Sequence, residues 1–213
     1  MTEPLRFASG DGFSLEGEID APEDPKATLV ICHPHPKMGG TMNAPLLLAV
    51  RDDMLARGWA VLRFNFRGIG ASEGEPSTGI EEVADADGAI AEASRRYPGI
   101  PVALAGWSFG AAVALRALSA HPEVLGCAAI APAIKPKPGI TAGAPDPGSF
   151  EPEGDVLLVG AANDDLVSPG DARAWASATG ARYEEVKGAN HFFWARYEPL
   201  TKLVGDFLDG LIA

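Results

Sequence analysis

A five-residue motif in the middle of the chain has the form of a nucleophile turn. It runs from Gly106 to Gly110 with Ser108 at its centre, follows the pattern GxSxG, and lies between the apolar runs VALA and AAVALRAL. A strand, a sharp turn and a helix in this order hold a serine hydroxyl exposed at the end of a sheet. Glycine is needed on both sides because side chains there would clash with the neighbouring strand and helix. The sequence therefore predicts that Ser108 is a nucleophile.

A serine hydroxyl is a weak nucleophile unless a base takes its proton, so a partner histidine is required. The chain has four histidines. His121 follows the predicted helix after Ser108 and fits a helix C-terminus, whereas His33 and His35 lie before the nucleophile in sequence. His191 follows the strand-like stretch 182–186, as expected of a loop histidine at the carboxyl end of a strand. We therefore predict that His191 is the base.

Two acidic residues compete for the group that orients this histidine. In a hydrolase of this type the acid comes between the serine and the histidine along the chain. The loop over residues 160–169 falls in that interval and contains Asp164 and Asp165 side by side. A shift of one residue exchanges the two, so the loop itself leaves both open.

Attack on an acyl carbon also requires N–H donors for the oxyanion that forms. The first is expected from the amide of Phe109, which follows the serine, and the second from the loop after the first central strand. Residues 33–36 of that loop read His-Pro-His-Pro, and proline has no N–H to donate. The amides of His35, Lys37 and Met38 remain as candidates.

The elements that must position these residues alternate along the chain. Apolar runs of strand length alternate with helical stretches, which predicts an α/β fold: a mainly parallel sheet with helices on both faces. A Gly-Asp-Gly turn predicts an N-terminal antiparallel hairpin over residues 5–20. Strands are expected at 28–32, 60–65, 102–105, 126–131, 155–159 and 182–186, and helices at 44–57, 80–97, 110–120, 170–178 and 200–212.

The stretch from Pro132 to Gly154 interrupts this alternation. It contains six prolines and four glycines, and proline lacks a backbone donor and fixes φ, so neither a regular helix nor a central strand fits there. The strand and helix pattern resumes afterwards. We therefore predict a surface excursion within a single domain, residues 1–213, rather than a linker between two domains.

The composition is that of an acidic globular protein. Apolar residues make up 46% of the chain and the formal net charge is −12, so neither nucleic acid nor an anionic membrane is expected as a partner. No secretion signal and no apolar run of bilayer length is visible, which predicts a cytoplasmic protein. The two cysteines, Cys32 and Cys127, lie in strand-like runs and are expected to be buried free thiols.

Three other groups of residues could have a chemical role. His33 and His35 could ligate a metal, but further ligands at suitable spacing are missing, so no metal and no other cofactor is expected. The turn that begins at Arg67 lacks the spacing of a phosphate-binding loop, and we expect Arg67 to bind nearby carbonyl groups beside the site. Trp107 and Trp194 are interpreted as packing residues, with pocket lining as the alternative.

Three motifs together resemble small bacterial members of the α/β-hydrolase superfamily that carry a His-Pro-His-Pro loop. They are the His-Pro-His-Pro stretch at 33–36 followed by Gly39-Gly40, the stretch NFRGIGAS at 65–72, and the GWSFG turn at 106–110. The resemblance covers nearly the full length. It implies an α/β-hydrolase fold in which no helical lid stands over the site.

The resemblance also bears on the two open assignments. The acid of the family precedes one residue of any type, two aliphatic residues and then Pro or Ser, which maps onto Asp164, although Asn163 departs from the usual spacing before it. The His-Gly-X pattern of the superfamily favours the amide of His35 as the second oxyanion donor.

What the resemblance implies is a hydrolase in which Ser108 attacks an acyl carbonyl, His191 shuttles the proton, Asp164 orients the imidazolium, and water clears the acyl-enzyme. Without a lid, small or short-chain acyl esters are the expected substrates. A thioesterase or peptidase would share the triad, and a non-catalytic binding protein on the same fold is a further alternative. A lactone hydrolase of the dienelactone type is disfavoured because its nucleophile is cysteine. The chain is expected to be a monomer or a homodimer whose partner is a small acyl substrate.

Overall fold

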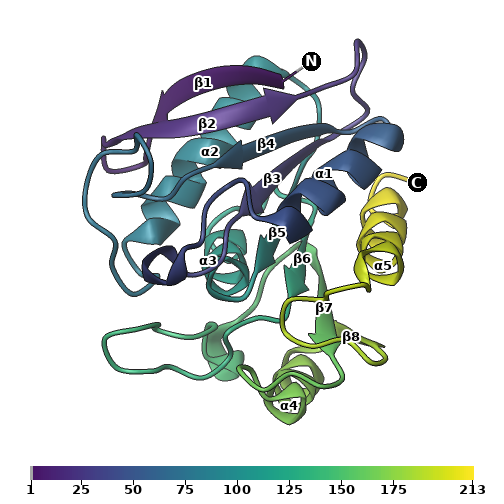
Figure 1. Ribbon diagram of the computed structural model, residues 1–213. Helices are drawn as coiled ribbons and strands as arrows, with labels where there is room; N and C mark the ends of the chain where they lie inside the picture. The colour runs from purple at the N-terminus through teal and green to yellow at the C-terminus, as the bar shows by residue number, and fades with distance from the viewer. Residues whose placement is uncertain (1) are drawn as a thin grey trace.

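The computed structural model describes residues 2–213, and its strands form one eight-stranded sheet in the order β1-β2-β4-β3-β5-β6-β7-β8 (Figure 1). The first two strands form an antiparallel hairpin and β2 is also antiparallel to β4, whereas all other neighbours are parallel. The bounds are β1 Thr2–Ala8, β2 Ser14–Asp20, β3 Thr28–Cys32, β4 Ala60–Phe64, β5 Val102–Trp107, β6 Gly126–Ile130, β7 Asp155–Ala161 and β8 Arg182–Val186.

Two apolar cores separate this sheet from the helices on its two faces. Helices α1 (Pro45–Ala56) and α5 (Tyr197–Gly210) pack on one face. Helices α2 (Glu82–Arg96), α3 (Phe109–Leu118) and α4 (Pro169–Thr179) pack on the other. The central strands are covered on both sides, and every residue of β3 is buried, which is why these strands read as continuous apolar runs. The predicted α/β fold with a parallel centre is confirmed.

The predicted elements are present, and the differences at their ends have local causes. Strand β5 continues past its predicted end because Trp107 still pairs with Ile130 of β6. Helix α5 begins at Tyr197, before its predicted start, because Pro199 lies in its first turn. The amides of a first turn have no acceptor inside the helix, so a missing N–H is tolerated there.

The excursion between β6 and β7 contains no α-helix. Only the short 3-10 helix η2 (Pro147–Ser149) and an isolated bridge between Lys137 and Thr141 interrupt its irregular backbone. Figure 1 shows it as a long loop that reaches α4. The predicted absence of a helical lid agrees with this backbone. Across residues 2–213, none of the helices combines the length and apolar character that crossing a membrane requires.

The carboxyl ends of the parallel strands bring four loops to one edge of the sheet. Strand β3 leads into the His-Pro-His-Pro loop and the 3-10 helix η1 (Pro36–Met38), and β5 leads into Ser108. Strands β7 and β8 lead into the loops that carry Asp164 and His191. Residues far apart in sequence therefore meet at this edge, as ligand-binding groups do in open α/β sheets.

Candidate active site

Ser108 lies on the sharp turn between β5 and α3. Its backbone has φ 57° and ψ −112°, a left-handed φ that a residue with a Cβ adopts only under strain. A Cβ at Gly106 would lie 2.4 Å from the carbonyl oxygen of Gly110, and one at Gly110 would lie 2.3 Å from the carbonyl oxygen of Cys32. Both flanking glycines are therefore required by close backbone contacts, as the motif predicts.

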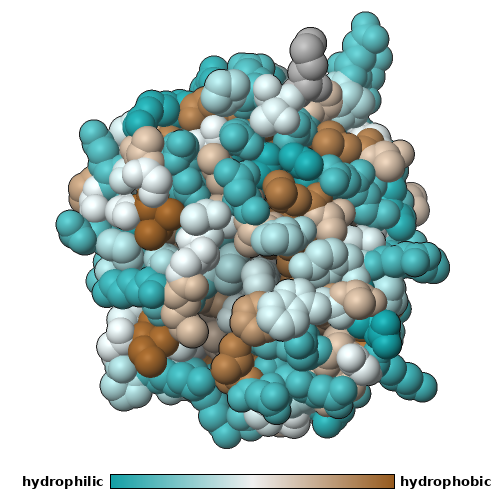
Figure 2. Space-filling model, in the orientation of Figure 1, coloured by the Kyte–Doolittle hydropathy of each residue, from teal (hydrophilic) through white to brown (hydrophobic). Residues whose placement is uncertain are grey.

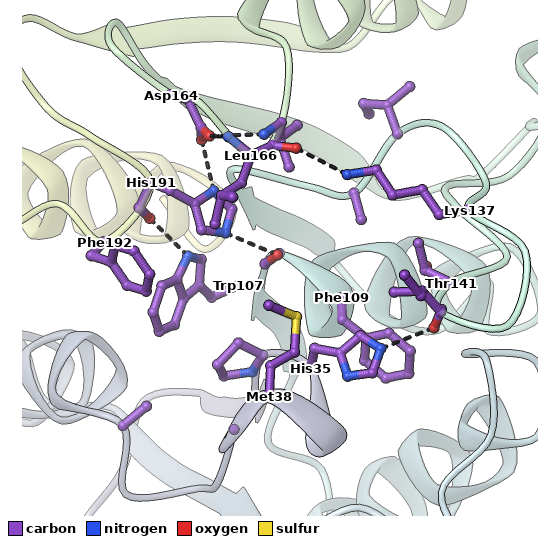
Figure 3. A pocket seen from close by; sticks show the side chains of 18 of the residues that line it. His35, Met38, Trp107, Phe109, Lys137, Thr141, Asp164, Leu166, His191 and Phe192 are labelled. Carbon is purple, nitrogen blue, oxygen red and sulfur yellow. Dashed lines mark hydrogen bonds and ion pairs between the residues drawn. The ribbon is translucent and has the colours of Figure 1, made fainter.

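The side chains of Ser108, His191 and Asp164 lie in hydrogen-bonded sequence (Figure 3). His191 Nε2 is 3.0 Å from Ser108 Oγ, and His191 Nδ1 is 2.7 Å from Asp164 Oδ2. Because Nδ1 faces a carboxylate, it carries the ring proton, which leaves Nε2 free to accept from the serine hydroxyl. The imidazole is buried, so water does not compete strongly for either contact.

Asp164, and not Asp165, contacts the histidine. Its second oxygen, Oδ1, accepts hydrogen bonds from the amides of Leu166 at 2.9 Å and Val167 at 2.8 Å. Burial acts to raise the pKa of Asp164, but the hydrogen bonds from His191 and these two amides outweigh it and hold the pKa below its ordinary value. The side chain is thus kept as a carboxylate facing the imidazole.

The additional residue before Asp164, Asn163, is accommodated by hydrogen bonds between the loops that follow β7 and β8. The amide of Asn163 donates to the carbonyl of Ala189 at 2.8 Å, and the amide of Ala162 donates to that of Val186. Parallel pairing thus continues beyond the ends of β7 and β8. This pairing carries the chain forward until Asp164, rather than an earlier residue, stands beside His191.

The candidate oxyanion donors differ in whether another group within residues 2–213 already accepts their hydrogen bond. Phe109 contributes the first N–H of α3, which has no partner inside the helix. Among the three loop candidates, the amide of Lys37 donates to His35 Nδ1 at 3.1 Å and that of Met38 donates to the His35 carbonyl at 3.0 Å. Within residues 2–213 neither Phe109 N–H nor His35 N–H makes a hydrogen bond.

The imidazoles of the two loop histidines hold backbone in place. His33 Nε2 accepts the amide of Phe66 at 3.0 Å, and its Nδ1–H donates to the carbonyl of Pro34 at 2.7 Å. Burial lowers the pKa of His33 to about 4, so the ring stays neutral. His35 Nε2–H donates to the carbonyl of Ile140 at 3.0 Å, which joins this loop to the excursion. Among residues 2–213, no group of three or more His, Cys, Asp and Glu side chains is arranged to hold a metal.

Arg67 binds carboxylates rather than the carbonyl groups that we predicted. Its Nη2 lies 2.7 Å from Asp85 Oδ1 and 3.0 Å from Asp11 Oδ1. Asp85 lies on α2 and is fully buried, and a buried carboxylate is stable only when a cation and hydrogen-bond donors are directed at it. The prediction was wrong because nothing in the sequence near Arg67 indicates that Asp85 of α2 packs against it.

The two tryptophans have different positions. Trp107 is buried in the core and also lines the pocket, and its Nε1–H donates to the carbonyl of His191 at 3.1 Å. Sequence reasoning missed this hydrogen bond, although the position of Trp107 next to the nucleophile is a signal for it. Trp194 is exposed, stacks on Phe192 and is not among the residues that line this pocket, so the interpretation as a packing residue is wrong for it.

A pocket of about 870 Å³ opens at Ser108. Figure 2 shows a hollow in this face of the molecule with apolar surface beside it. Ile134 and Ile140 of the excursion line the pocket, so the segment that stands in place of a lid forms a wall. Four residues that line the pocket have large apolar side chains that are also exposed to solvent: Met38, Ile140, Leu166 and Phe192.

Comparison with known proteins places this arrangement in a family. The model of the family described as serine aminopeptidase, S33 matches residues 23–150. An uncharacterised protein of Rickettsia prowazekii is 30% identical over 218 residues, which cover 96% of this chain and 88% of that protein.

Two solved structures share the whole architecture. An α/β serine hydrolase without a lid from Xanthomonas campestris is 26% identical, with a TM-score of 0.84 over 94% of this chain and 90% of that one. An α/β serine hydrolase homologue from Coxiella burnetii is 27% identical, with a TM-score of 0.83 over 94% of both chains. The S33 model matches more than half of the chain, and the Rickettsia protein is 30% identical over nearly all of it. The chain therefore belongs to the S33 family and, with it, to the serine hydrolases of the α/β-hydrolase superfamily.

Proposed function

We propose that this protein is a carboxylesterase-like enzyme that hydrolyses esters of small or short-chain carboxylic acids through a Ser108, His191, Asp164 triad. The observation that carries the proposal is the unbroken series of hydrogen bonds from Asp164 through His191 to Ser108. The same pocket includes His35 and Phe109, whose amides donate to no acceptor in the part of the chain described.

Each step of the reaction follows from these positions. As Ser108 Oγ attacks the ester carbonyl carbon, its proton passes to His191 Nε2, and the carbonyl oxygen becomes an oxyanion held by the amides of Phe109 and His35. The imidazolium, stabilised by Asp164, then gives its proton to the departing alkoxide, which leaves as an alcohol. Water then attacks the acyl-enzyme with His191 as base, which releases the carboxylic acid and restores Ser108.

A preference for short acyl groups is supported by the hydrogen bonds that hold the excursion in place. Arg116 of α3 donates to the carbonyls of Ala142, Gly143 and Ala144 at 3.1 to 3.2 Å. His35 holds the carbonyl of Ile140 from the other side. We expect a wall held by these hydrogen bonds to resist displacement by a long acyl chain.

Chain length can be tested with nitrophenyl esters of acids from about two to sixteen carbons. We expect kcat/KM to peak among the short acyl groups and to fall as the chain lengthens. A steady rise toward sixteen carbons would show that the wall does not limit the acyl group.

The triad itself is tested with a fluorophosphonate probe, which phosphonylates an activated serine as fluoride leaves. The wild-type protein should be labelled, and Ser108→Ala should abolish labelling. Ser168→Ala is the matched control, because Ser168 lines the same pocket, but its hydroxyl caps α4 and, among the described residues, makes no hydrogen bond to a histidine. Absence of label on the folded wild-type protein would favour a binding protein on this fold.

A further inference from the structure

The segment after His191 presents two aromatic side chains to solvent. Phe192 is 38% exposed and Trp194 is 66% exposed. Their rings stack with centroids 5.0 Å apart and an angle of 17° between their planes. Large aromatic groups gain free energy from burial, so an exposed stacked pair beside a pocket marks a binding surface.

The backbone that presents this pair is strained. Phe193 has φ 53° and Ala195 has φ 57°, a conformation that residues with a Cβ avoid. Phe193 is fully buried and anchors the segment between the two exposed rings. Strained backbone is often found at functional sites, and here it lies between and directly after the two exposed rings.

The pair is continuous with the reacting groups. The Phe192 ring centroid lies 5.7 Å from that of His191 and 5.9 Å from that of Trp107, and Phe192 lines the pocket. Figure 3 shows Phe192 and Trp107 beside His191, on the opposite side of the view from Lys137 and Thr141 of the excursion.

The leaving group must come close to the His191 ring, against which Phe192 packs. In the collapse of the tetrahedral intermediate, the departing oxygen takes its proton from His191 Nε2, so it must be within hydrogen-bond reach of that atom. The oxyanion points instead to the amides of His35 and Phe109. With these two directions occupied, an acyl group would extend toward the excursion, whose Ile134 and Ile140 line the pocket.

We propose that Phe192 and Trp194 form a stacking surface for the alcohol portion of the substrate, which makes the enzyme selective for esters of aromatic alcohols. This inference rests on the proposed esterase function. It assigns substrate selectivity to the leaving group, whereas the excursion limits the acyl group.

The test uses acetate esters that differ only in the alcohol: ethyl, cyclohexylmethyl, benzyl and 2-naphthylmethyl. These alcohols have similar acidity, so differences in kcat/KM report binding of the leaving group rather than its reactivity. We expect the wild-type enzyme to prefer the naphthylmethyl ester over the cyclohexylmethyl ester. Trp194→Ala and Phe192→Leu should each reduce that preference by about tenfold, mostly through KM, as loss of a stacking partner does.

Ile80→Ala is the matched control, because Ile80 is a large exposed apolar residue outside the pocket, and it should leave the preference unchanged. The inference would be overturned if Trp194→Ala and Phe192→Leu lowered kcat/KM equally on all four esters, or did not lower it at all. An unchanged preference with a shift in sedimentation coefficient in Trp194→Ala would also overturn it, because the pair would then cover a second copy of the chain. If no ester is turned over and no serine is labelled, the proposed function itself fails; turnover without selectivity defeats only the stacking surface.

Discussion

The two oxygens of Asp164 contact different groups, and this division predicts that an isosteric substitution will disturb His191. Oδ1 accepts two backbone amides and Oδ2 accepts the imidazole N–H. An asparagine keeps one carbonyl oxygen, and the two amides would hold it. Its NH₂ group would then face His191 Nδ1 and favour the tautomer with the proton on Nε2, which cannot accept a proton from Ser108.

We therefore expect Asp164→Asn to lower kcat by about 10³- to 10⁴-fold on an ester substrate. Asp165→Asn is the matched control, because Asp165 carries the same group one residue away and makes no contact with His191. Its kcat should change by less than about threefold. Steady-state kinetics on both variants decide the matter, and comparable losses in the two would mean that the hydrogen bond to Asp164 does not orient the catalytic imidazole.

At the level of elements, the nucleophile turn depends on how closely α3 approaches β3. The first turn of α3 lies against the carbonyls at the end of β3, and a Cβ at Gly110 would lie 2.3 Å from the carbonyl oxygens of both Cys32 and His33. Real Cβ atoms do not approach backbone oxygen so closely. Any larger residue must push the helix away from the strand, and Ser108 moves with the helix.

Gly110→Ala should therefore lower the free energy of unfolding by at least about 2 kcal/mol, as overpacking in a core does, and should also reduce labelling of Ser108. Gly210→Ala is the control, because that glycine ends α5 with nothing within 4 Å of an added Cβ. It should leave stability equal or slightly higher. Urea denaturation measures both, and an unchanged midpoint for Gly110→Ala would contradict the close contact.

Much of this architecture could be predicted from the sequence because local signals and burial agree. Strands β3 and β8 were predicted with their observed bounds, and the GxSxG turn follows from steric needs that any such turn has. Asp164 could not be separated from Asp165 by residue type, because the choice depends on pairing between the loops after β7 and β8.

The stacked pair of Phe192 and Trp194 could not be predicted from the sequence either, but for a different reason. The stretch over residues 192–194 reads Phe-Phe-Trp, and an apolar run gives no sign of which rings are buried. The alternation of exposed Phe192, buried Phe193 and exposed Trp194 depends on left-handed φ values at Phe193 and Ala195. Residues of these types avoid that conformation, so local preference points away from the observed backbone.

For the whole molecule, His33 links the stability of the fold to pH. Its ring joins the loop after β3 to the loop after β4 through Phe66 N–H, and this bond requires an unprotonated Nε2. Burial lowers the pKa of His33 from 6.5 to about 4 in the folded protein. Between these values the unfolded chain binds a proton that the native state does not, so stability decreases as pH falls. Above 6.5 the contribution is complete, and below 4 it is lost.

The full contribution corresponds to about 3 kcal/mol, of which roughly 2 kcal/mol should be lost between pH 7.5 and pH 5.0. His33→Gln removes the titrating group but leaves an oxygen that can accept Phe66 N–H. A decrease in the free energy of unfolding that the substitution causes equally at both pH values cancels when the two values are compared. Urea denaturation of both proteins at both pH values should show a decrease in unfolding free energy that is larger in the wild type by about this amount. Equal decreases would mean that the imidazole at position 33 titrates alike in the folded and unfolded chains, and that the loop beside Ser108 is held by packing rather than by a neutral ring.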